Sequence, residues 1–243
     1  MAWRRATVWC VGLAGILLAS LLLSAPSPVT ARPNGPAAGP SAARAASERP
    51  RIRFDPIPYD RARRRQMAAY SERHYGEHSW RLTEDQTRGV VLHYTAGPSY
   101  ESAWNTFASN APALGEKPGV CAQFIVDKDG KIYQLTRLEY RCRHAIGVNH
   151  RTIGIEMVQE SLGNPTVTAE AILARGQQSR AATRLVAWLK RRYGIRMRNV
   201  IGHAMANESE LFEDRRGWRN DHADWLEPEV KTFRHRVRRL LRS

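Results

Sequence analysis

The chain carries two periods of hydrophobic residues, one typical of helices and one typical of buried strands. From Tyr59 to Tyr75 the pattern is helical, and Gly76 follows as a helix stop. A second helix is predicted before Gly194, where apolar residues recur at helical spacing: Ala182, Leu185, Val186, Leu189 and Tyr193.

Five short apolar runs are predicted to be strands. Two of them flank Asp129-Gly130, a pair that favours the left-handed backbone of a tight turn, so we expect a hairpin there. Strands interleaved with helices predict an α/β fold, with a mixed central β-sheet and helices packed on both sides. The runs are Gly89 to His93, Val120 to Val126, Lys131 to Leu135, Thr152 to Val158 and Asn199 to His203.

The N-terminal residues have the pattern of an export signal. Arg4 and Arg5 precede an apolar run that ends at Pro26, and small residues up to Ala31 offer a cleavage site. An uncut membrane anchor is the alternative, but the run is slightly shorter than the ~20 apolar residues that a spanning helix needs. We therefore expect a signal peptide over residues 1–31, a secreted mature chain and no stable membrane insertion after cleavage.

Composition divides the remaining chain into a tether and one domain. Residues 32–50 are rich in Ala, Pro and Gly and contain no large aliphatic residue, so burial cannot offset the entropy cost of ordering them. Residues 51–243 show no second break of this kind and are expected to form a single domain. With 42% hydrophobic residues, the chain holds enough apolar material for a packed core.

The chain is strongly basic, since 38 Lys and Arg residues against 23 Asp and Glu residues give a formal net charge of +15. Long-range attraction therefore favours an anionic partner. The Arg-rich residues 61–65 and 234–242 could contact the phosphates of a nucleic acid or a membrane, but a solvated basic face is the commoner explanation. Outside a cell, anionic wall polymers are an equally good partner, and no specific nucleic acid is expected.

The cysteines indicate one disulfide. Three cysteines exclude a disulfide-dense miniprotein, and signal cleavage would remove Cys10. Cys121 and Cys142 remain and are expected to pair in an oxidising compartment. A metal site that uses Cys142 and His144 is the alternative, but a thiolate pair outside the cell competes poorly with oxidation.

Histidine carries the candidate chemistry, because a neutral imidazole is a common zinc ligand. His93 and His203 each end a predicted buried strand, and His222-Ala223-Asp224 supplies further donors. Neighbouring strands lie roughly 5 Å apart, so side chains at their ends can converge over one edge of a sheet. A single histidine is more often a packed or surface residue, and we expect His150 and His235 at the surface.

Five segments in a fixed order carry these residues: Gly89-Val90-Val91-Leu92-His93-Tyr94-Thr95, Phe124 to Gln134, His144-Ala145-Ile146-Gly147, Thr152-Ile153-Gly154-Ile155-Glu156 and Val200-Ile201-Gly202-His203. Together they resemble the type 2 N-acetylmuramoyl-L-alanine amidases, a zinc family that also includes the peptidoglycan recognition proteins. The resemblance covers roughly residues 88–229. It implies one catalytic zinc-amidase domain over residues 51–243.

The resemblance implies one Zn²⁺ held by His93, His203 and an acidic residue. Asp224, with His222 in the cationic place two positions before it, reproduces the family's local pattern but lies 21 positions after His203. Asp214, 11 positions after His203, suits the family's distance but lacks the cationic neighbour. Asp224 is the preferred ligand, because surface loops vary in length at little energetic cost.

The resemblance also implies catalytic roles. Glu156 would carry a proton from water to the leaving amine, His222 would stabilise the oxyanion, and His144 would contact the substrate or support the site. The implied substrate is peptidoglycan or a muropeptide, cut between the lactyl group of N-acetylmuramic acid and L-alanine. On pattern alone, Glu156 could instead face solvent from an edge strand.

Two other interpretations compete with a secreted, wall-associated amidase. The alternative function is a non-catalytic peptidoglycan-binding protein of the same fold. This chain, however, has a candidate residue for each of the three zinc ligands that the resemblance implies. The segment His74-Tyr75-Gly76-Glu77-His78 fits the H-x-x-E-H pattern of a class of zinc peptidases. That pattern needs a continuous helix, and Gly76 falls where the predicted helix ends.

Overall fold

The structure is a computed structural model that describes residues 48–242. The predicted signal peptide and residues 32–47 of the predicted tether lie outside the described residues, so both boundaries stay predictions. Within the described part of the chain, no helix is long and apolar enough to cross a membrane.

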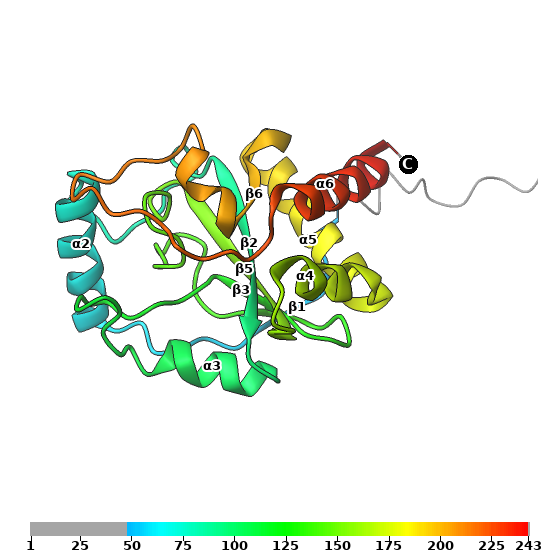
Figure 1. The fold of residues 1–243 in the computed structure, drawn as a ribbon. Coiled ribbons are helices and arrows are strands. Elements are labelled where there is room, and N and C mark those ends of the chain that lie inside the picture. The colour runs from blue at the N-terminus through cyan, green and yellow to red at the C-terminus, as the bar shows by residue number, and fades with distance from the viewer. Residues whose placement is uncertain (1–47, 243) are drawn as a thin grey trace, which may run out of the picture. The chain divides into compact units, whose positions relative to one another are not determined.

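Within residues 48–242, six strands form one mixed sheet (Figure 1). They are β1 (Ile52–Phe54), β2 (Gly89–Ala96), β3 (Phe124–Val126), β4 (Ile132–Gln134), β5 (Thr152–Glu160) and β6 (Val200–Gly202). Their order is β1-β4-β3-β5-β2-β6, and every neighbouring pair is parallel except the hairpin β3–β4. The predicted mixed sheet and hairpin are confirmed, with Gly130 at a φ of 84° in the turn.

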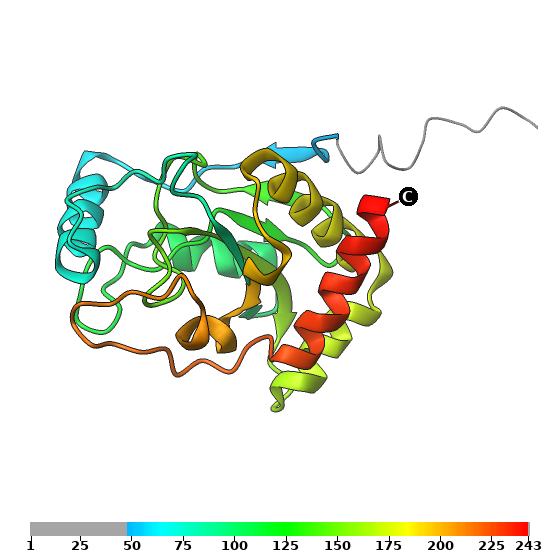
Figure 2. The same ribbon diagram turned by 90° about the horizontal axis from the view of Figure 1, so that it is seen from above.

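Helices cover both faces of this sheet, as predicted (Figure 1 and Figure 2). The helices are α2 (Arg61–Tyr75), α3 (Tyr100–Ala108), α4 (Pro165–Ala174), α5 (Gly176–Tyr193) and α6 (Glu227–Arg242), with short 3₁₀ helices η1 (Met197–Asn199) and η2 (His203–Glu208). On one face, α4, α5 and α6 share a core with the strands that includes Leu92, Leu185 and Phe233. On the other, α3 buries Phe107 in a second core with Ile125.

Helices α2 and α5 end where the sequence predicts. Gly76 and Gly194 follow them in the left-handed conformation, with φ of 71° and 63°. Asp60 begins α2, because its side chain accepts a backbone N–H of the first turn at 2.8 Å. Helix α5 begins earlier than its apolar pattern indicates, since the buried Gln178 donates from its first turn to backbone carbonyls of both β3 and β5.

Two features differ from the predicted elements. The strand expected from Val120 is shorter, because the side chain of Gln123, rather than its backbone, accepts the Gly154 N–H of β5 at 2.7 Å. Strand β1 and helices α3, α4 and α6 were not among the predicted elements. Helix α6 buries Val230 and Val237 against the core, although its sequence indicated only a basic tail.

The predicted disulfide between Cys121 and Cys142 is present, with their Cα atoms 5.1 Å apart. It lies in the core beneath α3 and joins the segment before β3 to the segment after β4. The second segment continues directly to His144. The alternative of a metal site on Cys142 is therefore excluded in the oxidised chain.

His150 is buried, so its expected surface position is wrong. Its ring stacks on Tyr75 with centroids 4.1 Å apart, and its Nδ1 has no hydrogen-bond partner among the described residues. Burial, and then the charges of Arg151 and Arg141, lower its pKa to about 3. An unfolded histidine titrates near 6.5, so the unfolded chain binds the extra proton between these values and the folded state loses stability as the pH falls from about 6.5 towards 3.

We expect His150→Phe to shift acid unfolding to a lower pH, because phenylalanine keeps the stacked ring and removes the titrating group. Circular dichroism across a pH titration measures the midpoint. The exposed His235 gives the matched control, and His235→Phe should leave the midpoint in place. An unchanged midpoint in His150→Phe would contradict the assignment.

Candidate metal and catalytic site

Three buried side chains bring nitrogen and oxygen donors together. His93 on β2, His203 at the start of η2 and Asp224 before α6 form the group that could hold a metal ion. The two Nδ1 atoms of the histidines lie 3.1 Å apart. Asp224 places one carboxylate oxygen 3.2 Å from Nδ1 of His93 and the other 3.0 Å from Nδ1 of His203. Ligands at the bond lengths of tetrahedral zinc lie roughly 3.3 Å from each other, so the triangle has the size that zinc requires.

The sheet positions the two histidines. Leu92 of β2 is the register partner of Gly202 of β6, so His93 and His203 follow at the same level on neighbouring parallel strands. Both donors therefore lie towards the carboxyl ends of their strands, where ligand sites of open α/β sheets occur. The sequence predicted this convergence, and the structure places the two residues together.

Asp224 reaches the histidines through a close backbone approach to β6. The Asp224 carbonyl accepts the Ala204 N–H at 3.0 Å. A Cβ at Gly202 would lie 1.7 Å from the carbonyl oxygen of Trp225, so only glycine fits this position. Trp225 is fully buried with a φ of 58° and packs edge-on against Phe233 of α6. The glycine that precedes His203 thus has a steric role in delivering the third donor.

Asn220 fixes the orientation of His203, and sequence reasoning missed it. The Nε2–H of His203 donates to Oδ1 of Asn220 at 2.9 Å, which leaves the lone pair on Nδ1, towards the other donors. Asn220 is itself held by Ile146, whose N–H and C=O both pair with its amide, and by Asn207. The only sequence signal was an amide residue close to His222.

His144 supports His93 in the same way. Its Nδ1 lies 3.2 Å from Nε2 of His93, while its own Nε2 lies 3.4 Å from the carbonyl of Thr152. If His93 donates from Nε2, its Nδ1 lone pair faces Asp224. A Cβ at Gly154 would lie 2.7 Å from the His144 ring, so this glycine makes room for the pair. The predicted substrate contact of His144 stays a prediction. The two ring nitrogens of His144 face His93 and Thr152.

Burial and close contacts shift the pKa values of His93, His144 and Asp224. Burial lowers the pKa of His93 to about 4, although the neighbouring Asp224 carboxylate opposes this shift, and burial lowers the pKa of His144 well below its ordinary value. For Asp224, burial alone would raise the pKa, but the close contacts with the rings of His203 and His93 bring it well below the usual range. Neutral imidazoles beside an ionised carboxylate are the forms that coordinate zinc.

Glu156 lies beside this group and not on a solvent-facing edge strand. It is the register partner of His93 across β2 and β5, so both side chains leave the same face of the sheet. Its Oε2 has no hydrogen-bond partner among the described residues. Burial, and then the charge of Asp224, raise its pKa to about 8. A carboxyl group with this pKa can exchange protons near neutral pH.

His222 covers the outer side of the donors. Its ring stacks on His203, with centroids 4.7 Å apart and planes 18° from parallel, while 67% of its side chain is exposed. A nitrogen of this ring is therefore available to a group that approaches from solvent. The position agrees with the predicted oxyanion contact, which itself stays a prediction.

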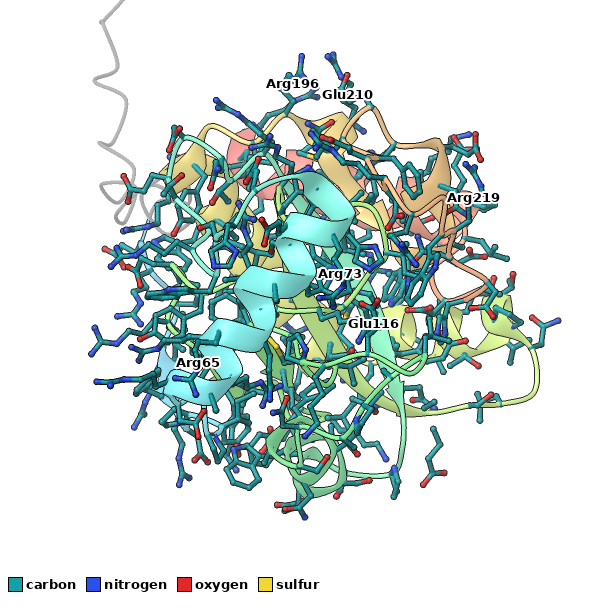
Figure 3. All side chains as sticks on the ribbon, turned by 90° about the vertical axis from the view of Figure 1, so that its left-hand side faces the viewer. Arg65, Arg73, Glu116, Arg196, Glu210 and Arg219 are labelled. Atoms are coloured by element: carbon teal, nitrogen blue, oxygen red, sulfur yellow. A yellow bond between two sulfur atoms is a disulfide. The ribbon has the colours of Figure 1, made fainter. Side chains whose placement is uncertain are left out.

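Asp214, the alternative ligand, belongs to a different cluster. The loop of residues 208–219 crosses to the end of α2 (Figure 1), where Asp214 accepts from Nδ1 of the buried His74 at 2.7 Å. Nε2 of His74 faces Glu116 at 3.1 Å, and Glu116 also pairs with Arg73 at 3.0 Å (Figure 3). Asp214 is thus a structural anchor for this loop.

The H-x-x-E-H segment forms no metal site. Gly76 ends α2 between the two histidines, as predicted. His74 is buried between Asp214 and Glu116, while His78 is exposed and pairs with Glu72. The two rings therefore do not share a helix face.

A mixed α/β sheet with a buried His-His-Asp group at the ends of its parallel strands defines a candidate metalloenzyme. The family model described as N-acetylmuramoyl-L-alanine amidase matches residues 83–224, which is more than half of the chain. The chain belongs to the N-acetylmuramoyl-L-alanine amidase family, and membership supports a peptidoglycan amidase. The matched range includes all three donors and ends at Asp224.

Several solved structures are similar to this chain. The endolysin N-acetylmuramoyl-L-alanine amidase LysCS from Clostridium intestinale is 18% identical, with a TM-score of 0.47, over 76% of this chain and 96% of that one. The hydrolase AmiA from Staphylococcus aureus, solved in complex with its ligand, is 15% identical, with a TM-score of 0.48, over 81% of this chain and 87% of that one. Comparison with curated proteins gives no match.

We expect Asn220→Ala to weaken zinc binding about 10–100-fold, because His203 loses the acceptor that fixes its ring. Competition with a chromogenic chelator measures the affinity. Asn220→Asp keeps an oxygen acceptor and should recover most of the loss. The exposed Asn105 on α3 gives the control Asn105→Ala, which should bind zinc normally. Equal affinity of Asn220→Ala and the unmodified chain would contradict this positioning role.

Asp224→Asn and Asp214→Asn should differ in metal content. The first removes a charged donor from the triangle and should leave less than a tenth of the bound zinc after gel filtration. The second lies in the His74 cluster and should retain about one zinc per chain, with a lower thermal stability. Elemental analysis of both purified variants decides the ligand, and zinc loss confined to Asp214→Asn would reverse the assignment.

Proposed function

We propose that this chain is a secreted, zinc-dependent N-acetylmuramoyl-L-alanine amidase. It hydrolyses the amide bond between the lactyl group of N-acetylmuramic acid and L-alanine in peptidoglycan or a muropeptide. The observation that carries the proposal is the buried His93–His203–Asp224 triangle, in a chain whose family supports a peptidoglycan amidase. The predicted signal peptide supports export to the cell wall.

The donor set fits a catalytic zinc ion. Two imidazoles and one carboxylate leave a fourth tetrahedral position open, which is typical of catalytic sites and not of structural ones. His93, His203 and Asp224 would hold the ion, with His144 and Asn220 orienting the two rings. When bound, zinc supplies Lewis acidity that makes water more acidic and polarises a carbonyl group.

Glu156 moves the proton in this reaction. Its buried carboxylate takes a proton from the attacking water and delivers it to the nitrogen of L-alanine as the amide bond breaks. Its Oε2 is free to do so, because no described residue occupies it. Burial, and then the charge of Asp224, raise the pKa of Glu156, so the group can hold the proton between the two steps.

His222 stabilises the charge that develops on the carbonyl oxygen. Its exposed ring can donate a hydrogen bond to the oxyanion of the tetrahedral intermediate. Stacking on His203 holds the ring beside the donors, so the contact needs little reorganisation when the substrate binds. This role explains a histidine two positions before the acidic ligand.

The alternative function is a peptidoglycan-binding protein without catalysis. Such a protein needs neither a complete donor set nor a buried proton carrier beside it. This chain has both, since Glu156 pairs with His93 in the register of β2 and β5. The enzyme is therefore the preferred interpretation.

A digest of purified cell wall tests the proposal. The zinc-loaded chain should release new L-alanine amino termini, which end-group labelling and mass spectrometry detect. His93→Ala should lose both zinc and hydrolysis. Glu156→Gln should keep zinc and lose about 10²–10⁴-fold in turnover, because it removes the proton carrier alone.

Glu160→Gln is the matched control, since this exposed carboxylate ends the same strand and should leave turnover unchanged. Full activity of Glu156→Gln would exclude Glu156 as the proton carrier. Bound zinc with wall binding but no new amino termini would support the non-catalytic alternative.

A further inference from the structure

The positive charge of the protein is concentrated on two neighbouring helices. The described residues include 34 Lys and Arg against 23 Asp and Glu, a net charge of +11. Helix α5 carries five of the basic residues and no acidic one, while α6 carries six basic and two acidic residues. Together these two helices have a net charge of +9. The two helices pack side by side on one face of the sheet (Figure 2).

An open groove of about 540 Å³ lies between α5 and α6. Arg180 and Arg184 line it from α5, and Arg236 and Arg239 line it from α6. Its other lining residues are small or aliphatic: Gly176, Ser179, Thr183 and Leu240. No acidic residue lines the groove, and within residues 48–242 no carboxylate forms an ion pair with any of the four arginines.

The four arginines differ in exposure. We call the half-buried Arg236 the floor of the groove and the three exposed arginines its rim. Arg236 is half-buried and donates to the carbonyl of Leu173 and to the hydroxyl of Ser179, so it is fixed in place. Arg180, Arg184 and Arg239 are exposed and can reach a ligand in the groove. Guanidinium groups match phosphate oxygens in a bidentate fork, so this arrangement favours a ligand with several phosphates.

Two further features of this surface argue against other classes of anionic ligand. No aromatic ring lines the groove, so it lacks the stacking platforms on which single-stranded nucleic acids bind. None of the exposed large hydrophobic residues of the described chain lies on α5 or α6, so the face has nothing to insert into a lipid bilayer. Both observations favour a flexible anionic polymer over a single-stranded nucleic acid or a lipid surface.

We propose that the α5–α6 groove binds a phosphodiester-linked anionic polymer of the poly(glycerol phosphate) type. Successive phosphates contact Arg180, Arg184 and Arg239 along the rim while Arg236 holds the floor. The site shares no residue with the His93–His203–Asp224 triangle, and the inference does not rest on the proposed amidase activity. Such a contact would hold the protein at an anionic surface through a region separate from the metal site.

Binding of poly(glycerol phosphate) to the full chain, followed by calorimetry over a series of salt concentrations, tests this proposal. The triple variant Arg180→Gln, Arg184→Gln and Arg239→Gln should weaken binding at least tenfold at about 0.1 M salt. It should also reduce the slope of log Kd against log salt by about two, because fewer counterions are released.

The control is Arg61→Gln, Arg65→Gln and Arg137→Gln, three exposed arginines outside the groove whose loss changes the net charge equally. It should weaken binding less than threefold, and thermal unfolding checks that both triples are folded. Equal weakening by the two triples would overturn the proposal, because it would mean that attraction depends on net charge alone.

Two further ligands and one further variant complete the experiment. Single-stranded polynucleotide of equal phosphate number and anionic phospholipid vesicles should both bind more weakly than poly(glycerol phosphate). Tighter binding of either would overturn the assigned ligand. His93→Ala should bind the polymer as the unmodified chain does, so a failure of the amidase and a failure of the groove are distinguishable.

Discussion

The close approach of residues 224–225 to β6 is the contact on which the geometry of the candidate metal site depends. Asp224 belongs to a segment far along the chain from β2, and its backbone bond to Ala204 helps to bring its carboxylate between the two histidines. That bond requires a position without a side chain at Gly202. Trp225 is buried against Phe233 of α6 and holds the segment in place. The position of Asp224 therefore depends on the packing of α6.

The loop of residues 208–219 shows how a long connection can keep a ligand in position. The amides of Asn207 and Asn220 bond to each other and close the loop at its base. At its far side, Asp214 is anchored on the buried His74 of α2. Because both the base and the far side are fixed, the length between His203 and Asp224 does not loosen the site. The same asparagine that closes the base also orients His203, which couples the loop to the metal-binding ring.

Charge is divided between two parts of the molecule. At the metal site, burial keeps His93 and His144 neutral and retains a proton on Glu156 to a higher pH than usual. On α5 and α6, by contrast, basic residues outnumber acidic ones by nine, and the exposed Arg180, Arg184 and Arg239 pair with no carboxylate of the described residues. The first region holds protons in a low-dielectric environment, and its His-His-Asp group could hold a metal ion there. The second attracts anions over the distance that solvent screening allows.

The sequence by itself predicted five of the six strands, the hairpin at Asp129-Gly130 and the helix ends at glycines, because these depend on local periodicity and backbone preference. It predicted the pairing of Cys121 with Cys142 from the number of cysteines and the expected oxidising compartment. It also predicted that His93 and His203 converge, since both end strands of one sheet. The sequence favoured Asp224 over Asp214 as the acidic donor, but only the tertiary structure placed the two in different clusters, buried His150 and revealed Asn220. Those outcomes depend on which segments meet across 17 to 140 positions of the chain, and no local pattern encodes such contacts.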